Sequence, residues 1–159
     1  MASARVTKRI RAFVDTDYGR VVAAVALATR DRDQAEDAVQ DALVTLMRDG
    51  HEPDNLAAWV TVVAINGARS RHRRADAERR AVSRLVWQEP AEPSADRATV
   101  AEAVRALPPR QREIAAMYYY LDTSVADIAA ALDIAQGTVK TQLSRARAAL
   151  AKTLEGVAR

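Results

Sequence analysis

The stretch 124–150 constrains the fold of this chain more than any other, because it predicts two helices joined by a very short turn. Ser124 is a favourable N-cap for the first helix, and Asp133 tolerates the left-handed backbone that such a turn needs. A connection this short makes the helices cross sharply, as in a helix-turn-helix whose second helix enters the DNA major groove. The expected apolar faces are Ile128, Ala129 and Leu132 in the first helix and Val139, Leu143, Ala146 and Leu150 in the second.

The opposite side of the second helix carries side chains that donate hydrogen bonds. Such donors bond base edges or phosphates in DNA. An ordinary basic surface on a helical hairpin is the alternative, but the turn spacing and the donor-rich face coincide, and this favours DNA contact. The outward-facing residues are Thr138, Lys140, Thr141, Gln142, Ser144, Arg145 and Arg147.

The composition favours helices over sheets. Only 4% of the 159 residues are aromatic and only five are glycine, while alanine is abundant. We therefore expect an all-α fold of two small helical domains, residues 1–85 and 98–159. A flexible linker over residues 86–97 joins them, because this stretch contains prolines and polar residues without periodicity.

The formal net charge of +3 hides a strong charge pattern. Residues 31–54 carry two basic and eight acidic groups, whereas residues 66–81 carry six basic and two acidic groups. Residues 136–159 carry five basic groups and one acidic group. Two separate basic blocks predict two nucleic-acid surfaces, and the acidic block predicts a protein partner with basic groups.

The acidic block also reads as an amphipathic helix that Gly50 terminates. Asp33 followed by Glu36 is a capping signal for its start. One face is apolar and continues to Met47, and the other is acidic and polar. A further helix begins after an Asp54 or Asn55 cap, with an apolar first part and a basic second part.

The residues needed for catalysis are missing. The two histidines, His51 and His72, fall in a predicted loop and on a solvated helix, and no Gly-rich phosphate loop, His-x-x-x-His or Cys-x-x-Cys spacing is present. Asp33, Asp37 and Asp41 lie four residues apart and could share a metal, but an acidic helix face is the favoured interpretation. The chain has no cysteine for a disulfide, a zinc–cysteine site or a thiol nucleophile. The apolar run 21–28 is too short to span a membrane. We expect a cytoplasmic, non-enzymatic protein with no cofactor, metal, small-molecule substrate or membrane insertion.

Three segments together resemble the extracytoplasmic-function (ECF) sigma factors of bacterial RNA polymerase. "AEDAVQDAL" (residues 35–43) looks like the helix of the second sigma domain that docks on the polymerase. "AAWVTVVAINGARSRHRR" (residues 57–74) looks like the helix that melts the promoter and reads the minus-10 element. Residues 107–150 look like the fourth sigma domain nearly throughout, so the resemblance covers roughly residues 10–152.

The resemblance implies three groups of functional residues, and a strand-capture loop over residues 49–55. Core RNA polymerase would contact Glu36, Asp37, Gln40, Asp41 and Val44. Minus-10 DNA would lie near Asn66, Arg69, Arg71, Arg73 and Arg74. Minus-35 DNA would meet Gln136, Gly137, Thr138, Lys140, Thr141, Ser144, Arg145 and Arg147.

The chain departs from the family pattern at several positions. Ile65 stands where an arginine often precedes the asparagine, and Arg69 and Ser70 stand where an acidic residue is common. Ala135 replaces a usual capping serine, and Gln142 replaces a common arginine.

Other readings of the sequence remain open. An operator-binding regulator of the LuxR type shares a similar helix-turn-helix, but leaves the acidic helix and the first basic block unexplained. A sequestering protein that merely resembles a sigma factor is a further alternative, and an enzyme is disfavoured by the missing site. The family also implies an anti-sigma factor as a partner, besides core polymerase and promoter DNA.

Overall fold

The computed structural model describes residues 3–82 and 100–157, and all regular structure within them is helical. The predicted all-α class is therefore confirmed for these residues, whereas the predicted linker at residues 86–97 lies outside them. No described helix is both long enough and apolar enough to cross a membrane. The elements are α1 (Ala4–Thr16), α2 (Tyr18–Thr29), α3 (Arg32–Asp49), α4 (Leu56–Val82), α5 (Val100–Arg105), α6 (Pro109–Ala115), the π-helical turn η1 (Ala116–Tyr120), α7 (Val125–Leu132) and α8 (Gln136–Val157).

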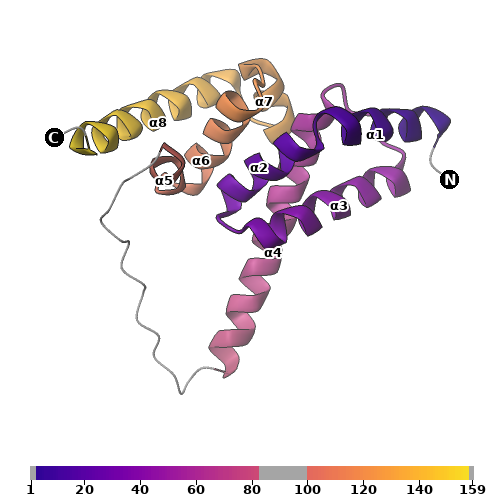
Figure 1. Ribbon diagram of the computed structural model, residues 1–159, viewed down its shortest axis with the longest axis horizontal. Coiled ribbons are helices and arrows are strands. Elements are labelled where there is room, and N and C mark those ends of the chain that lie inside the picture. Colours follow the sequence, from indigo (N-terminus) through magenta and orange to yellow (C-terminus); the bar gives the residue numbers. More distant parts are fainter. Residues whose placement is uncertain (1–2, 83–99, 158–159) are drawn as a thin grey trace.

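Helices α1 to α4 form the N-terminal half, in which α2 and α3 pack against α4 (Figure 1). Its core is a cluster of small and β-branched side chains that includes Val25, Val39, Val60 and Ile65. The second part of α4 runs past α3 and extends away from the other helices (Figure 1). The basic half of α4 is consequently open on most sides.

Local caps fix the ends of α3 and the start of α4. The Asp31 side chain accepts a hydrogen bond from the Gln34 N–H at 3.0 Å, so α3 begins earlier than the predicted Asp33 cap. Gly50 ends α3 with φ +64°, as predicted. Asn55 caps α4 by accepting from the Ala58 N–H at 3.0 Å.

Helices α5 to α8 form the C-terminal half, which contains the predicted helix-turn-helix. Ser124 accepts a hydrogen bond from the Asp127 N–H at 3.0 Å, and Asp133 takes the left-handed conformation with φ 53°. Val139 is fully buried in one cluster with Ala129, so α8 packs into α7 as the sequence indicates. Both the predicted cap and the predicted turn residue of the helix-turn-helix are confirmed.

The π-helical turn η1 follows α6 and is not foreseen by the sequence pattern. It spans Ala116–Tyr120 and directly continues α6. Within it Met117 is fully buried, while Tyr119 and Tyr120 are about half exposed, at 48% and 47%. The turn therefore directs two adjacent tyrosines to the surface, and Tyr119 meets Arg147 of α8.

The two halves pack against each other through shared apolar clusters. Ala58 and Val62 of α4 join one cluster with Met117, Ile128 and Val139 of the C-terminal half. Another cluster combines side chains of α2 with side chains of α5, α6 and α8; its buried members are Ala24, Leu27, Val104, Leu107, Ala115, Ala116 and Ala146. The predicted domains thus share buried surface in this arrangement.

One side chain predicted to be in the core lies outside it. Met47 is 45% exposed, although the sequence pattern places it on the apolar face of α3. The preceding Leu46 is buried, lining the same small space as Val6 of α1. The Met47 side chain leaves α3 about 100° away from that of Leu46, so it does not point toward α1.

Replacing Gly50 by alanine should lower the free energy of unfolding by about 1–2 kcal/mol, because an L residue is strained at positive φ. A Cβ atom added at Gly50 would meet no heavy atom within 4 Å, so strain is the expected cause rather than a clash. Urea denaturation followed by circular dichroism measures the change. Gly19→Ala in α2 is the control, since Gly19 also has free space but ordinary helical geometry. The control should be neutral or stabilising by up to about 1 kcal/mol; equal losses in both variants would contradict the argument.

Candidate nucleic-acid interface

The outer face of α8 presents a continuous set of polar and basic side chains. Val139, Leu143 and Ala146 hold the opposite face in the core, with 2% exposure or less. Because buried and exposed positions alternate with the helical period, the donors point away from the protein. The exposed residues of the predicted minus-35 set are Gln136, Gly137, Thr138, Lys140, Thr141, Ser144, Arg145 and Arg147, whereas Gln142 is half-buried.

Arg147 is held in place by two tyrosines that sequence analysis overlooked. Its Nε donates to the Tyr119 hydroxyl oxygen at 2.8 Å, and its guanidinium lies 5.8 Å from the centre of the Tyr118 ring. The hydrogen bond to Tyr119 raises the pKa of Arg147. The two rings meet edge to face with centroids 5.0 Å apart. Their position depends on the π-helical turn, which no periodicity rule predicts.

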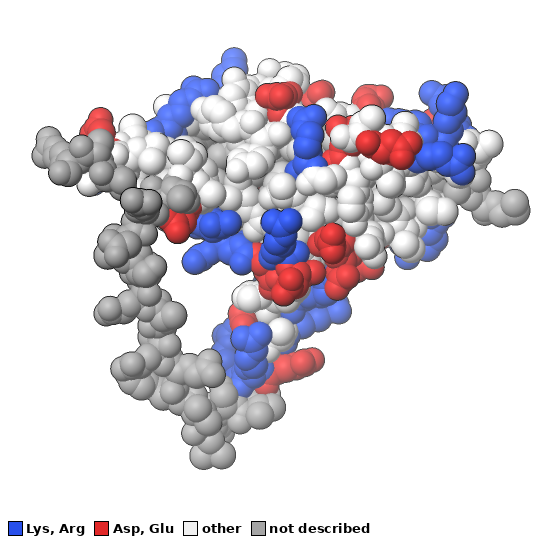
Figure 2. Space-filling model, viewed as in Figure 1, with Lys and Arg blue, Asp and Glu red and all other residues white. Residues whose placement is uncertain are grey.

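The five residues predicted to meet minus-10 DNA do not form one continuous surface. Asn66, Arg73 and Arg74 are exposed on α4. Arg69 instead turns toward the C-terminal half, where its Nη1 lies 3.2 Å from Oε2 of Glu113. Arg71 turns the other way, toward α3 (Figure 2 shows basic side chains on several sides of this helix).

The predicted polymerase-binding residues share one exposed face of α3. Glu36, Asp37 and Gln40 are exposed, and Val44 is 62% exposed despite its apolar side chain. Asp41 accepts a hydrogen bond from Arg71 of α4 at 2.6 Å, so the acidic face borders the basic helix. An exposed valine beside carboxylates suits contact with a partner that offers both cations and apolar surface.

A buried charge, absent from the sequence-based predictions, lies where the two halves meet. Glu113 of α6 is fully buried, and its Oε2 is 3.2 Å from both Arg69 of α4 and Arg110 of α6. Next to it, Arg112 is 9% exposed and donates from Nε to the Ala28 carbonyl at 2.7 Å. Burial, followed by the charges of Arg30 and Arg69, lowers the pKa of Arg112.

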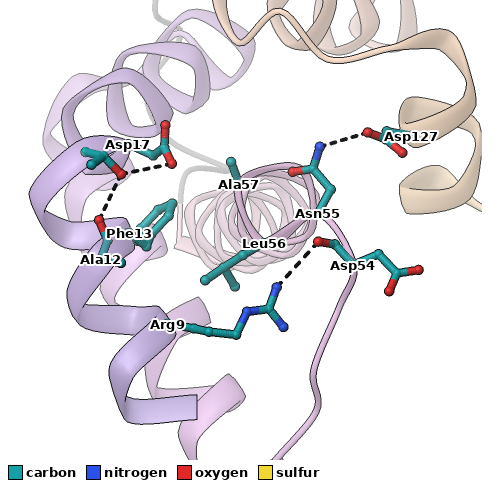
Figure 3. Close-up of a pocket in the computed structure, with 10 residues that line it drawn as sticks. Arg9, Ala12, Phe13, Asp17, Asp54, Asn55, Leu56, Ala57 and Asp127 are labelled. Carbon is teal, nitrogen blue, oxygen red and sulfur yellow. Dashed lines mark hydrogen bonds between the residues drawn. The ribbon is translucent and has the colours of Figure 1, made fainter. Parts of the chain in front are cut away.

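The segment before α4, part of the predicted strand-capture loop, is tied to α1. Arg9 donates to the Pro53 carbonyl at 2.6 Å and lies 3.4 Å from the Asp54 carbonyl (Figure 3). Asn55 also bridges the halves, because its Nδ2 donates to Oδ2 of Asp127 in α7 at 3.0 Å (Figure 3). Arg9, Asp54, Asn55 and Asp127 are among the residues that line a cavity of about 480 Å³. Within the described residues, no cluster of three or more His, Asp or Glu side chains is placed to hold a metal ion.

Two family models match separate parts of the chain in sequence order. The Sigma-70 region 2 model matches residues 14–78, and the Sigma-70 region 4 model matches residues 97–150. Among characterised relatives, the ECF RNA polymerase sigma factor SigM of Mycobacterium tuberculosis is 33% identical over 138 residues, covering 80% of this chain and 68% of SigM. SigL of the same species is 32% identical over 169 residues, covering 97% of this chain and 93% of SigL.

Two solved structures contain chains with a similar fold. The co-crystal structure of the sigma factor RpoE in complex with the anti-sigma factor NepR from Bartonella quintana contains a similar chain, with a TM-score of 0.73 and 27% identity; the match covers 93% of this chain and 98% of that one. The structure of CnrH in complex with the cytosolic domain of CnrY gives a TM-score of 0.57 and 26% identity, covering 87% and 88%.

A helix-turn-helix with an open donor-rich face, together with a second basic helix, defines a helical DNA-binding protein. The two matched sigma regions and the sequence identity to SigM and SigL identify the family within this class. The chain belongs to the sigma-70 family and, within it, to the ECF RNA polymerase sigma factors.

Replacing Arg69 by methionine should lower the free energy of unfolding by about 3 kcal/mol, because it removes one partner of a buried carboxylate. Arg71→Met is the matched control on the same helix, since the carboxyl side chain that Arg71 meets is 67% exposed. That surface pair should contribute about 1 kcal/mol or less. Denaturant titration of both variants measures the difference. Equal losses of unfolding free energy in the two variants would show that Arg69 does not stabilise the buried carboxylate of Glu113.

Proposed function

We propose that this sigma factor binds core RNA polymerase and directs promoter-specific initiation by reading minus-35 and minus-10 DNA. The observation that carries the proposal is the exposed donor face of α8, set opposite three buried side chains in a helix-turn-helix. A major groove accepts a helix of this kind, and each good bidentate base contact contributes roughly 1–3 kcal/mol of discrimination. The exposed α8 residues are proposed to read the minus-35 element.

The two remaining surfaces complete the proposed mechanism. The acidic face with Asp37 and Val44 would dock on the polymerase, and Asn66, Arg73 and Arg74 would meet minus-10 DNA. Phosphate contacts would supply most of the DNA affinity, so binding should weaken steeply with salt. One small helix-turn-helix discriminates modestly, but two DNA-reading parts held by one polymerase gain from their effective concentration. Catalysis, a cofactor and a metal have no place in this proposal, which assigns the protein to the cytoplasm.

An anti-sigma factor is proposed as a further partner. RpoE, whose fold this chain shares, was solved together with the anti-sigma factor NepR. A protein that holds the two halves together would keep the chain from reading both promoter elements. An operator-binding regulator is the rival function, which the match to region 2 disfavours because such a regulator needs no polymerase-docking domain.

The described arrangement has to open for both elements to be read. Val62 of α4 and Val139 of α8 belong to one cluster. Asn66 lies about 6 Å along α4 from Val62, and Arg145 about 9 Å along α8 from Val139, at 1.5 Å per residue. The elements, by their names, are roughly 25 base pairs apart, or about 85 Å of straight duplex. In the described arrangement, which we call closed, the proposed minus-10 and minus-35 surfaces lie far too close together to span that distance.

A covalent link between the halves should therefore abolish initiation. Arg20 of α2 and Asp122 lie across the junction, 3.9 Å apart, and neither belongs to a proposed contact surface. The chain has no cysteine, so Arg20→Cys with Asp122→Cys introduces one thiol pair. A short, cleavable bis-maleimide would close the junction. Transcription should be lost on crosslinking and should return on cleavage, while each single-cysteine variant stays active; full activity of the crosslinked form would refute the opening step.

Run-off transcription with purified core polymerase on bacterial genomic fragments tests the function directly. Discrete new transcripts should appear with the protein, and their aligned start sites should expose two upstream elements. Arg145→Ala should weaken use of the upstream element by roughly tenfold or more, the value of one base contact. Lys152→Ala, also exposed on α8 but outside the proposed contact set, is the matched control. Specific duplex binding without polymerase binding or transcripts would favour the operator-binding regulator.

A further inference from the structure

A second cavity opens where the two halves meet, on the side of α4 that faces α6. Its volume is about 550 Å³, which lies within the usual range for small-molecule sites. The walls come from the end of α2, the start of α3, the middle of α4 and the start of α6. Both halves therefore contribute to one partly open cavity.

The lining of this cavity is strongly cationic. Four arginines stand against a single carboxylate, that of Asp31, which gives the lining a net charge of +3 with His72 neutral. The buried Glu113 lies behind Arg69 and offsets one of these charges. The arginines are Arg30, Arg69, Arg73 and Arg112.

Arg30 and Arg112 are the strongest evidence for an anion site, because neither belongs to a proposed DNA-contact set. Arg112 reaches into the junction from the C-terminal half, where its Nη1 donates to the Arg105 and Leu107 carbonyls at 3.1 Å each. These carbonyls fix the side chain but do not neutralise its charge. Arg30 follows α2 in the left-handed conformation, with φ 64°. Cations gathered in this way repel one another until an anion joins them.

We propose that this cavity binds a small phosphorylated molecule of the di- or triphosphate class. Guanidinium groups pair with phosphate oxygens through two parallel hydrogen bonds, and several arginines converge here from both halves. A polyphosphate gives each of them an oxygen, whereas a single carboxylate satisfies only one or two. The apolar surfaces of Ala28, Ala68 and Pro109 leave room for the rest of such a molecule.

Binding would favour the closed arrangement. The ligand touches both halves only while they are packed together, so its binding free energy adds to the stability of that state alone. It would also occupy Arg73, which is proposed to meet minus-10 DNA, and Arg69, for which the sequence predicts the same contact. This consequence rests on the proposed function; the binding of the anion does not.

Isothermal titration calorimetry of the full chain with sodium pyrophosphate tests the site. DNA and polymerase are absent, and sodium chloride keeps the ionic strength constant. The wild type should show saturable binding of one pyrophosphate. Arg30→Gln should weaken the affinity by roughly tenfold or more, as for the loss of a hydrogen bond between charged groups.

Arg79→Gln is the matched control, because it removes the same charge from α4 outside the cavity, where Arg79 lies 3.9 Å from Asp76. Its affinity should stay within about twofold of wild type. Absence of saturable binding, or equal losses in both variants, would overturn the proposal. So would a short single-stranded oligonucleotide that displaces pyrophosphate and depends equally on Arg30, since the cavity would then belong to a nucleic-acid backbone. Without polymerase in the assay, failure of the sigma function would leave this result unchanged.

Discussion

The burial of one carboxylate, that of Glu113, determines how the two halves of the molecule fit together. A fully buried charge is costly unless cations and hydrogen bonds compensate it. Arg110 supplies one such contact from the same helix, but Arg69 has to come from α4. The charge on α6 therefore requires the N-terminal half in this position, and the apolar clusters on either side close around it.

Helix α4 serves three purposes because its faces differ. Val60 and Ile65 are buried in the N-terminal core, while Ala58 and Val62 are buried against the C-terminal half. The third face of α4 carries polar side chains such as the exposed Asn66. Beyond its apolar part, the helix extends away from the other helices (Figure 1). A helix that forms the core, the junction and a proposed DNA surface transmits any change in one of them to the others. In the proposed mechanism, separation of the halves would free Arg69 from Glu113 and expose Ala58 and Val62 at the same time.

The pairing of charges across the molecule has a common physical logic. Arg71 meets Asp41 of the proposed polymerase-binding face, and Arg69 meets Glu113 across the junction. Each pair holds an arginine that DNA would otherwise attract, so the closed molecule is partly neutralised within itself. In the proposed mechanism, opening and docking would exchange these internal partners for external ones. The exchange is modest for the exposed Asp41 pair, because solvent screens it, and larger for the buried carboxylate.

The sequence by itself determined the features that depend on local geometry. Helical periodicity, the Ser124 cap, the left-handed Asp133 and the Gly50 stop all follow from interactions within a few residues, and all are found in the structure. The chain also contained enough of the family pattern to indicate its class. Only the tertiary structure decided the rest. Glu113 and Arg112 look like ordinary surface charges of a short helix, and Arg69 looks like one more cation on α4, until folding brings together groups that are 44 or 84 residues apart. The π-helical turn, in which Met117 is fully buried, was not predicted either. Long-range contacts of this kind leave no periodic trace in the sequence, and this is why the closed junction and its cationic cavity were not predicted.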